Sequence, residues 1–290
     1  MPVTVVYSGL GLGVLYGFIG IGFAIGFAAL GRFNFAFPQF LVAGVFLSYW
    51  AGVTLQLPLV WTLAIAGVGC GLLALIEYVF VLVPVARRGA HGGELVATVG
   101  FAIVIQGAIE FIWGNTPLGI PSPVPTGAID LLGGRVVPGT LILLGIVVAI
   151  AAGLEVLSRF TGIGLAIRAV RQDREAAAVL GISPARIGIA VLVITAVFAG
   201  FLGPLVGSRT AAVSDLGNYL AVGGFIAYAS AGEEAYLGTL LLGLLIGVAQ
   251  SEVATLLNVN FQNLALLVLL SVALIAKPTG LFGRGGLRAV

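Results

Sequence analysis

The sequence predicts an all-α polytopic integral membrane protein, and three features of its composition support this fold class. Of the 290 residues, 60% are hydrophobic and only 8% are charged, whereas a soluble domain has about 25% charged residues. The mean hydropathy is +1.19. Glycine occurs 44 times, and it is frequent in membrane helices because it lets their backbones approach closely. A net charge of +2 without a basic run excludes nucleic acid as a partner.

Apolar stretches with few or no charged residues predict the membrane spans, because an α-helix of about 20 residues crosses the hydrocarbon core. Such stretches occupy 3–30, 39–56, 58–85, 94–113, 137–157, 186–207, 217–231, 236–256 and 261–276. The segment 217–231 is the shortest and either spans the membrane or is re-entrant. We therefore expect eight or nine transmembrane helices.

The basic residues predict the orientation of these helices. When alternate loops are placed on the same side, eleven of the 13 Lys and Arg residues share one side, and only Arg135 and Arg209 lie on the other. Cytoplasmic loops are rich in Lys and Arg. This places the N-terminus outside and the C-terminus in the cytoplasm, with residues 1–290 forming a single transmembrane domain in contact with membrane lipid.

Two hydrophilic loops interrupt this pattern. The loop at 114–136 contains four prolines, which predicts a stiff external connection. The loop at 158–186 contains five arginines and two acids and lies on the cytoplasmic side in this arrangement.

Within the second loop, residues 164–182 are expected to form a helix outside the bilayer. Its charged residues recur at three- and four-residue spacing, which places them on one face; these are Arg168, Arg171, Arg174 and Glu175. Glycine favours the position just after a helix, so Gly181 is expected to end it. Ser183 and Pro184 then supply the cap and first-turn proline of the next span.

The chain lacks the residues that most enzymes need. Its one lysine, Lys277, is not part of a phosphate-binding G-x-x-x-x-G-K-[ST] pattern. One histidine, His91, and one cysteine, Cys70, make no metal cluster or nucleophilic triad. We therefore predict no catalytic residue, metal ligand or cofactor in this chain, and a catalytic membrane enzyme is the least favoured class.

Small residues at four-residue spacing predict faces for close helix packing. They are Gly9, Gly13 and Gly17, with the pairs Gly203/Gly207 and Gly243/Gly247.

Polar and aromatic residues within apolar segments are candidates for the lining of a solute path. The segment 34–39 offers Asn34, Phe35, Phe37 and Gln39, with Pro38 expected to break the helix and leave carbonyl groups free. This segment is either path lining or a plain link between helices. Gln106 either faces the path or bonds a neighbouring helix. Glu77 is the deepest acid and the best candidate among the acids, whereas Glu110 is expected to reach the outer interface.

Four stretches resemble permease subunits of branched-chain amino-acid ABC importers. The most specific is GLAIRAVRQDREAAAVLGI at 164–182, which is similar to the cytoplasmic signature of that family. The other three are LGRFNFAFPQF at 30–40, ATVGFAIVIQGAIEFIWGNTP at 97–117 and KPTGLFGR at 277–284. The chain departs from the family at Phe37-Pro38-Gln39, where a His-Gly-acid sequence is usual, and at 228–234.

The resemblance implies a bacterial inner-membrane subunit that transports branched-chain amino acids or similar amino-acid or amide solutes. It implies three kinds of partner: a second permease, as a copy or a paralogue; two cytoplasmic ATPase subunits that hold ATP and Mg²⁺; and an extracytoplasmic solute-binding protein. It also implies that 164–182 is the coupling helix. Arg168, Arg171 and Arg174 would anchor it in an ATPase subunit, with Asp173 and Glu175 setting the register.

Two alternatives stay open from the residues alone. The first alternative is that the 158–186 loop is an ordinary solvated amphipathic loop and not a coupling element. The second alternative is that the whole chain is a secondary transporter or channel that works without an ATPase, although that class favours an intramembrane charge relay or an inverted repeat.

Overall fold

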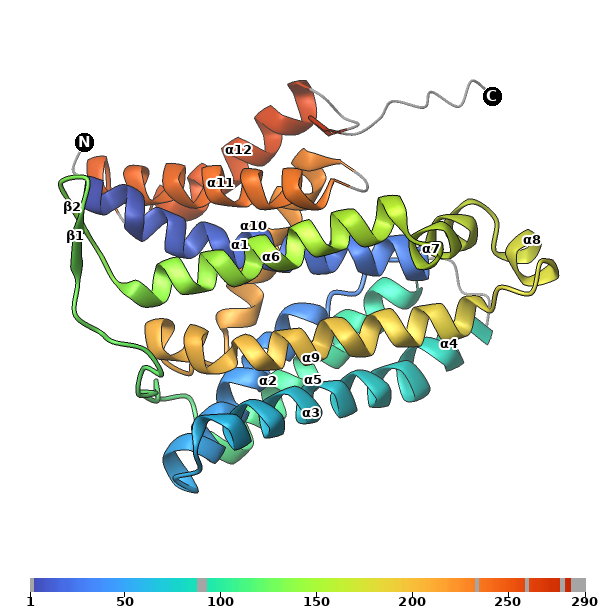
Figure 1. Ribbon diagram of the computed structural model, residues 1–290, viewed down its shortest axis with the longest axis horizontal. Coiled ribbons are helices and arrows are strands. Elements are labelled where there is room, and N and C mark those ends of the chain that lie inside the picture. The colour runs from blue at the N-terminus through green and yellow to red at the C-terminus, as the bar shows by residue number, and fades with distance from the viewer. Residues whose placement is uncertain (1–2, 88–92, 233–234, 259–260, 277–279, 283–290) are drawn as a thin grey trace. The chain divides into compact units, whose positions relative to one another are not determined.

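The computed structural model describes residues 3–87, 93–232, 235–258, 261–276 and 280–282. These residues are almost entirely helical (Figure 1), as the all-α prediction requires. Within these ranges, seven helical spans are long and apolar enough to cross a membrane. They are α1 (Val3–Leu30), α2 with its π-helical end η1 (Phe37–Thr54), α3 with η2 and α4 (Leu59–Arg87), α5 (Gly93–Trp113), α6 (Pro138–Phe160), α9 (Pro184–Thr210) and α11 (Tyr236–Leu256).

Two further helices coincide with predicted spans but are shorter. Helix α10 (Leu216–Ala231) has 16 residues and α12 (Gln262–Ala276) has 15. Both fall below the length of about 17 residues that a helix needs to cross the hydrocarbon core without distortion. All nine predicted segments are therefore helical, and seven of them have the length of a full span. His91 and Lys277 lie outside the described residues.

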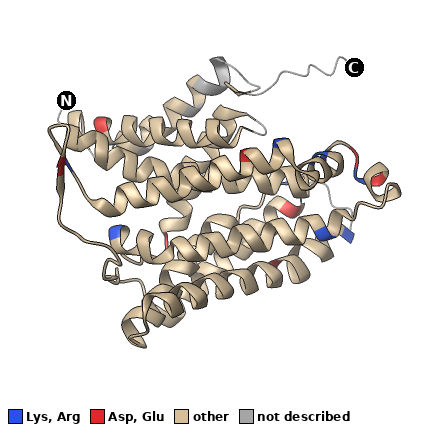
Figure 2. Cartoon of the chain, viewed as in Figure 1, with Lys and Arg blue, Asp and Glu red and all other residues tan. Residues whose placement is uncertain are grey.

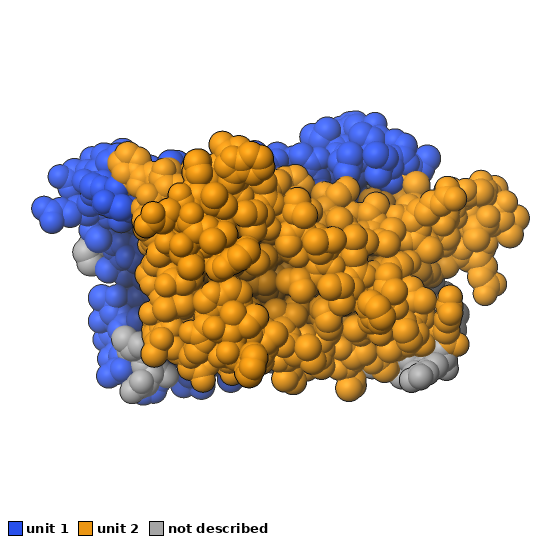
Figure 3. Space-filling view, turned by 90° about the horizontal axis from the view of Figure 1, so that it is seen from below, with its two compact units in different colours: residues 1–25, 126–165, 220–290 blue, residues 26–125, 166–219 orange. Residues whose placement is uncertain are grey.

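Contacts within the chain divide it into two compact units (Figure 3). Unit 1 comprises residues 1–25, 126–165 and 220–290, and unit 2 comprises residues 26–125 and 166–219. Charged residues are sparse along the long helices (Figure 2).

Unit 2 is built around three helices, α2, α3 and α9, that pack against one another. Glycine makes the closest of these approaches possible, because a Cβ atom at Gly44 of α2 would lie 2.7 Å from the Gly200 Cα atom of α9. A Cβ atom at Gly203 would meet the Gly44 carbonyl oxygen. Helix α5 packs on α2 and on η2 (Tyr78–Leu82).

In unit 1, residues 3–25 of α1 pack against α11, and α11 also contacts α6 and α12. A Cβ atom at Gly13 would lie 2.6 Å from the Leu244 Cα atom, and one at Gly9 would lie 2.5 Å from the Val248 Cα atom. Gly243 and Gly247 approach the same helix from the α11 side. These contacts confirm that the regularly spaced glycines form packing faces.

The end of the loop at 114–136 forms a small hairpin in unit 1. Strand β1 (Ile129–Leu131) pairs antiparallel with β2 (Gly134–Val136). The turn residues Leu132 and Gly133 have φ values of 49° and 81°, as a tight two-residue hairpin turn requires.

Candidate functional site

Residues 31–36 form a non-helical link between α1 and α2 in unit 2. Gly31 ends α1 with a φ of 69°, and the Asn34 side-chain oxygen accepts a hydrogen bond of 2.8 Å from the Ala36 backbone nitrogen. Pro38 lies in the first turn of α2, where the missing N–H has no partner to lose. The expectation that Pro38 breaks a helix was wrong; it begins one.

Side chains of α3 and α5 hold this link in place. The Asn34 amide donates a hydrogen bond of 2.8 Å to Glu77 of α3, and the Phe35 backbone nitrogen donates to the Thr98 hydroxyl of α5 at 3.2 Å. Arg32 forms an ion pair with Glu94. Glu77 is fully buried, and its second carboxyl oxygen has no hydrogen-bond partner among the described residues. Two predicted candidates, Asn34 and Glu77, therefore form one buried pair.

A second group of polar side chains forms a continuous hydrogen-bonded row in unit 2, which we call the polar chain. Gln39 donates to Asn218 at 3.3 Å, and Asn218 donates to Gln106 at 2.8 Å. Gln106 donates to Glu110 at 2.9 Å, and Ser214 donates to the same Glu110 oxygen at 3.0 Å. The row joins α2, α5 and the start of α10, so two more predicted candidates, Gln39 and Gln106, belong to one cluster.

The polar chain extends from the interior of unit 2 to its surface. Gln39 is 1% exposed and its side-chain oxygen has no hydrogen-bond partner among the described residues, whereas Gln106 is half-buried and Asn218 is exposed. Polar side chains within membrane spans face protein or a water-filled cavity rather than lipid. The surface around Asn218 therefore suits contact with water, solute or another protein.

The other path candidates have packing roles in the structure. Phe37 is buried and meets the Phe40 ring edge-on at 6.5 Å, and the Phe35 ring lies 6.3 Å from Phe33. The Glu110 carboxyl group accepts hydrogen bonds from Gln106 and Ser214, and its position at the outer interface stays a prediction.

Sequence reasoning missed Asn218, Ser214 and Thr98. The available signal for Asn218 was an amide within the otherwise apolar segment 217–231.

The single helix expected over 164–182 was wrong: the structure has two helices there, α7 (Gly162–Gln172) and α8 (Arg174–Val179). Asp173 separates them with extended backbone angles. Its carboxylate accepts hydrogen bonds from the Glu175 and Ala176 backbone nitrogens at 2.9 and 3.0 Å. Aspartate competes for backbone N–H groups in this way and favours a helix start over a helix interior.

The predicted end of this loop is confirmed. Gly181 has a φ of 83°, and the Gly181 and Ile182 backbone nitrogens donate to the Ala178 and Ala177 carbonyls, which is a Schellman motif. Ser183 caps α9 by accepting from the Arg186 backbone nitrogen, with a proline in the first turn.

Helix α8 presents both charge and apolar surface. Arg174 and Glu175 are exposed, and Val179 and Leu180 are 88% and 77% exposed. Arg168 and Arg171 on α7 are half-buried. The Arg174 side chain also reaches α1 and donates a hydrogen bond of 2.7 Å to the Leu30 carbonyl oxygen. In Figure 1, α8 lies in the connection that leads to the first turn of α9.

A family model described as "Branched-chain amino acid transport system / permease component" matches residues 5–276. Three similar proteins are each named a high-affinity branched-chain amino acid transport system permease protein. They are LivH of Salmonella typhimurium, 23% identical over 291 residues, LivH of Escherichia coli K12, 24% over 299, and BraD of Pseudomonas aeruginosa, 26% over 289. Each alignment covers 96% of this chain and 94% of the relative.

Among solved structures, the one titled "PsaBC from Streptococcus pneumoniae in complex with Fab" aligns with 97% of this chain and 92% of its own. The TM-score is 0.49 at 13% identity.

Proposed function

This chain belongs to the permease-component family of branched-chain amino acid transport systems, and from that premise we propose that it is the membrane pathway of an ATP-driven ABC importer. Its solutes are branched-chain amino acids, or amino-acid or amide solutes of similar size. Its setting is the bacterial inner membrane, with the N-terminus outside and the C-terminus in the cytoplasm. The polar chain is the observation that carries the structural side of this proposal.

Amino acids cross the membrane as zwitterions, so their pathway needs donors and acceptors within the span. The side chains of Gln106 and Asn218 are amides, which both donate and accept hydrogen bonds. Glu110 adds a carboxyl group to the same row. In the proposal these three side chains line the path. The buried Gln39 side chain positions Asn218 by donating a hydrogen bond to it. Asn34, Phe35, Phe37 and Glu77 then support the helix link rather than touch solute.

The energy comes from other subunits in this proposal. The chain lacks the Gly-rich lysine pattern that holds nucleotide phosphates, so ATP and Mg²⁺ bind two cytoplasmic ATPase subunits. An extracytoplasmic binding protein delivers the solute, and a second permease, a copy or a paralogue, completes the pathway. The coupling surface is α8 with Val179 and Leu180, whose exposed apolar side chains suit a cleft in the ATPase.

Two variants separate the coupling surface from the pathway in proteoliposomes that contain the complete importer. Leu180→Asp is expected to lower both co-purification of the ATPase and solute-stimulated hydrolysis at least about tenfold, because it puts a charge into an apolar contact. Leu132→Asp, an equally exposed leucine on the hairpin, is the control. Normal hydrolysis and uptake by Leu180→Asp would contradict the coupling assignment.

The second variant, Asn218→Leu, is expected to slow uptake about tenfold while the ATPase still co-purifies, because a donor and an acceptor leave the path. Its control is Ser271→Leu on α12, where the hydroxyl donates a hydrogen bond to the Leu267 carbonyl oxygen of its own helix. Uptake at the unmodified rate would show that the polar chain does not line the path.

A further inference from the structure

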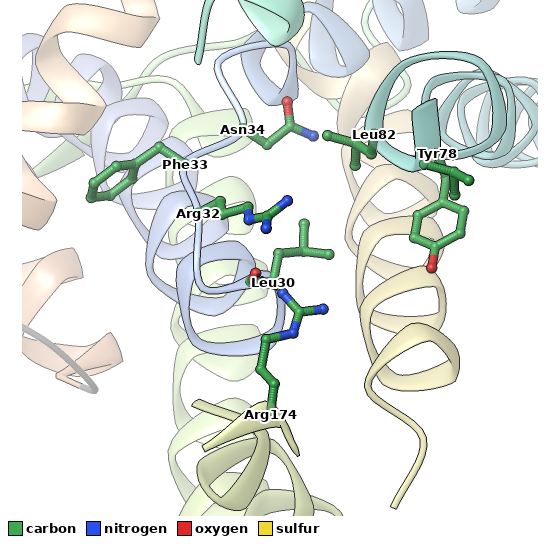
Figure 4. A pocket seen from close by; sticks show the side chains of 8 residues that line it. Leu30, Arg32, Phe33, Asn34, Tyr78, Leu82 and Arg174 are labelled. Carbon is green, nitrogen blue, oxygen red and sulfur yellow. Dashed lines mark hydrogen bonds between the residues drawn. The ribbon is translucent and has the colours of Figure 1, made fainter. Parts of the chain in front are cut away.

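Two arginines from distant parts of the sequence meet at one cavity in unit 2. The cavity has a volume of about 50 Å³, and Arg32 of the link and Arg174 of α8 both line it, with Leu30 between them (Figure 4). A single bound water needs about 10–15 Å³. The cavity therefore has room for a group of a few heavy atoms.

The charges around the cavity are unbalanced in favour of positive charge. Glu94 pairs with Arg32, whereas no carboxylate among the described residues forms an ion pair with Arg174, whose recorded partner is the Leu30 carbonyl. Burial, and then the nearby Arg174 guanidinium, lower the pKa of Arg32. Two like charges facing one cavity repel each other, and a bound anion removes that cost.

The remaining walls combine polar and apolar groups. Asn34 lies at the inner end, and its amide is engaged with Glu77. Leu82 and Val83 give an apolar side. Tyr78 and Leu82 belong to the π-helix η2, and such π-helical turns occur often at functional sites.

We propose that this cavity binds a phosphate group, held by the Arg32 and Arg174 guanidinium groups. Arginine matches phosphate geometry with paired N–H donors, and basic cavities between membrane helices bind phospholipid head groups. The phosphate comes either from an anionic phospholipid, whose chain would lie along Leu82 and Val83, or from free phosphate. Because Arg174 is at the start of α8, the anion would tie the cytoplasmic loop to the end of α1. The site does not depend on the proposed transport activity.

Native mass spectrometry of the full chain in mixed micelles tests this site directly. Phosphatidylglycerol and phosphatidylcholine are offered at equal concentration, and inorganic phosphate is offered separately in phosphatidylcholine micelles. The double variant Arg32→Gln/Arg174→Gln is expected to retain about tenfold less of the anion than the unmodified chain. The matched control Arg87→Gln/Arg186→Gln removes two exposed arginines and should retain the normal amount.

The two arms identify the source of the phosphate. Selective retention of phosphatidylglycerol assigns a lipid head group, and retention of inorganic phosphate without lipid selectivity assigns a free anion. Equal retention by the double variant and the unmodified chain in both arms would overturn the proposal.

A second measurement keeps both arginines and so does not depend on the double variant folding. A fluorophore is attached at Ala86→Cys, an exposed position on α4 outside the cavity lining, since Cys70 is fully buried and does not compete for the label. Phosphatidylglycerol with brominated chains should quench it at least about twofold more than brominated phosphatidylcholine, or inorganic phosphate should shift its emission. If brominated phosphatidylglycerol gives no extra quenching and inorganic phosphate gives no emission shift, the proposal is overturned.

Discussion

The buried pair Asn34–Glu77 allows a quantitative prediction about what holds the helix link. In Asn34→Ala the chain loses the 2.8 Å hydrogen bond to Glu77 and the 2.8 Å bond to the Ala36 backbone nitrogen. Side-chain hydrogen bonds between membrane helices contribute about 0.6 kcal/mol on average and up to about 1.7 kcal/mol. We place this pair near the upper end, at about 1.5 kcal/mol, because Glu77 is fully buried and Asn34 is its one hydrogen-bond partner among the described residues.

The local bond to Ala36 adds about 1 kcal/mol, so Asn34→Ala should lower the free energy of unfolding by roughly 2.5 kcal/mol in total. A double-mutant cycle with Glu77→Ala isolates the pair, because the Ala36 bond is lost equally with and without Glu77. Unfolding of the full chain by SDS in mixed micelles gives the four free energies. A coupling energy below about 0.3 kcal/mol would refute the claim that this pair anchors the link.

Further predictions concern helix packing and the loop. Gly13→Val should lower the free energy of unfolding by about 3 kcal/mol, since a Cβ atom there would lie 2.6 Å from the Leu244 Cα atom. Gly145→Val on α6, where a Cβ atom meets nothing within 4 Å, is the control, and equal losses would contradict the packing interpretation. Asp173→Ala should cost α8 about 1 kcal/mol, seen as about fivefold faster hydrogen exchange at Glu175 and Ala176; unchanged exchange would contradict the capping role.

Much of the fold could be predicted because membrane helices carry strong local signals. The apolar stretches with few charges located each helix of the described residues that has the length of a span. Gly181 and Ser183 marked a helix end and a helix start through local backbone requirements that do not depend on tertiary contacts. The regularly spaced glycines predicted packing faces for the same reason: close approach requires a missing side chain at that position.

The break at Asp173 was missed because two readings of one residue compete. Charged residues at three- and four-residue spacing favour a continuous helix, whereas an aspartate that accepts from the backbone nitrogens two and three residues ahead starts a new one. Aspartate is a common N-cap, and at Asp173 this capping chemistry outweighs the helical spacing of the neighbouring charges.

The site was harder to predict, because hydrogen-bond partners that are distant in sequence leave no local signal. Gln39 and Gln106 were recognised as polar residues in apolar segments, but their connection runs through Asn218, which is 179 residues from Gln39. The same holds for Asn34 and Glu77, which are 43 residues apart. Local pattern identified the candidate side chains, and only tertiary packing could pair them.

The central claim is that this chain is a pathway driven by separate ATPase subunits, and ATP dependence of uptake tests it most directly. Proteoliposomes containing the complete importer and its binding protein would be loaded with ATP or with a non-hydrolysable analogue, and the initial uptake of radiolabelled leucine measured. We expect uptake only with hydrolysable ATP. Uptake at the same rate with the analogue would contradict the account and assign the chain to the transporters and channels that work without an ATPase.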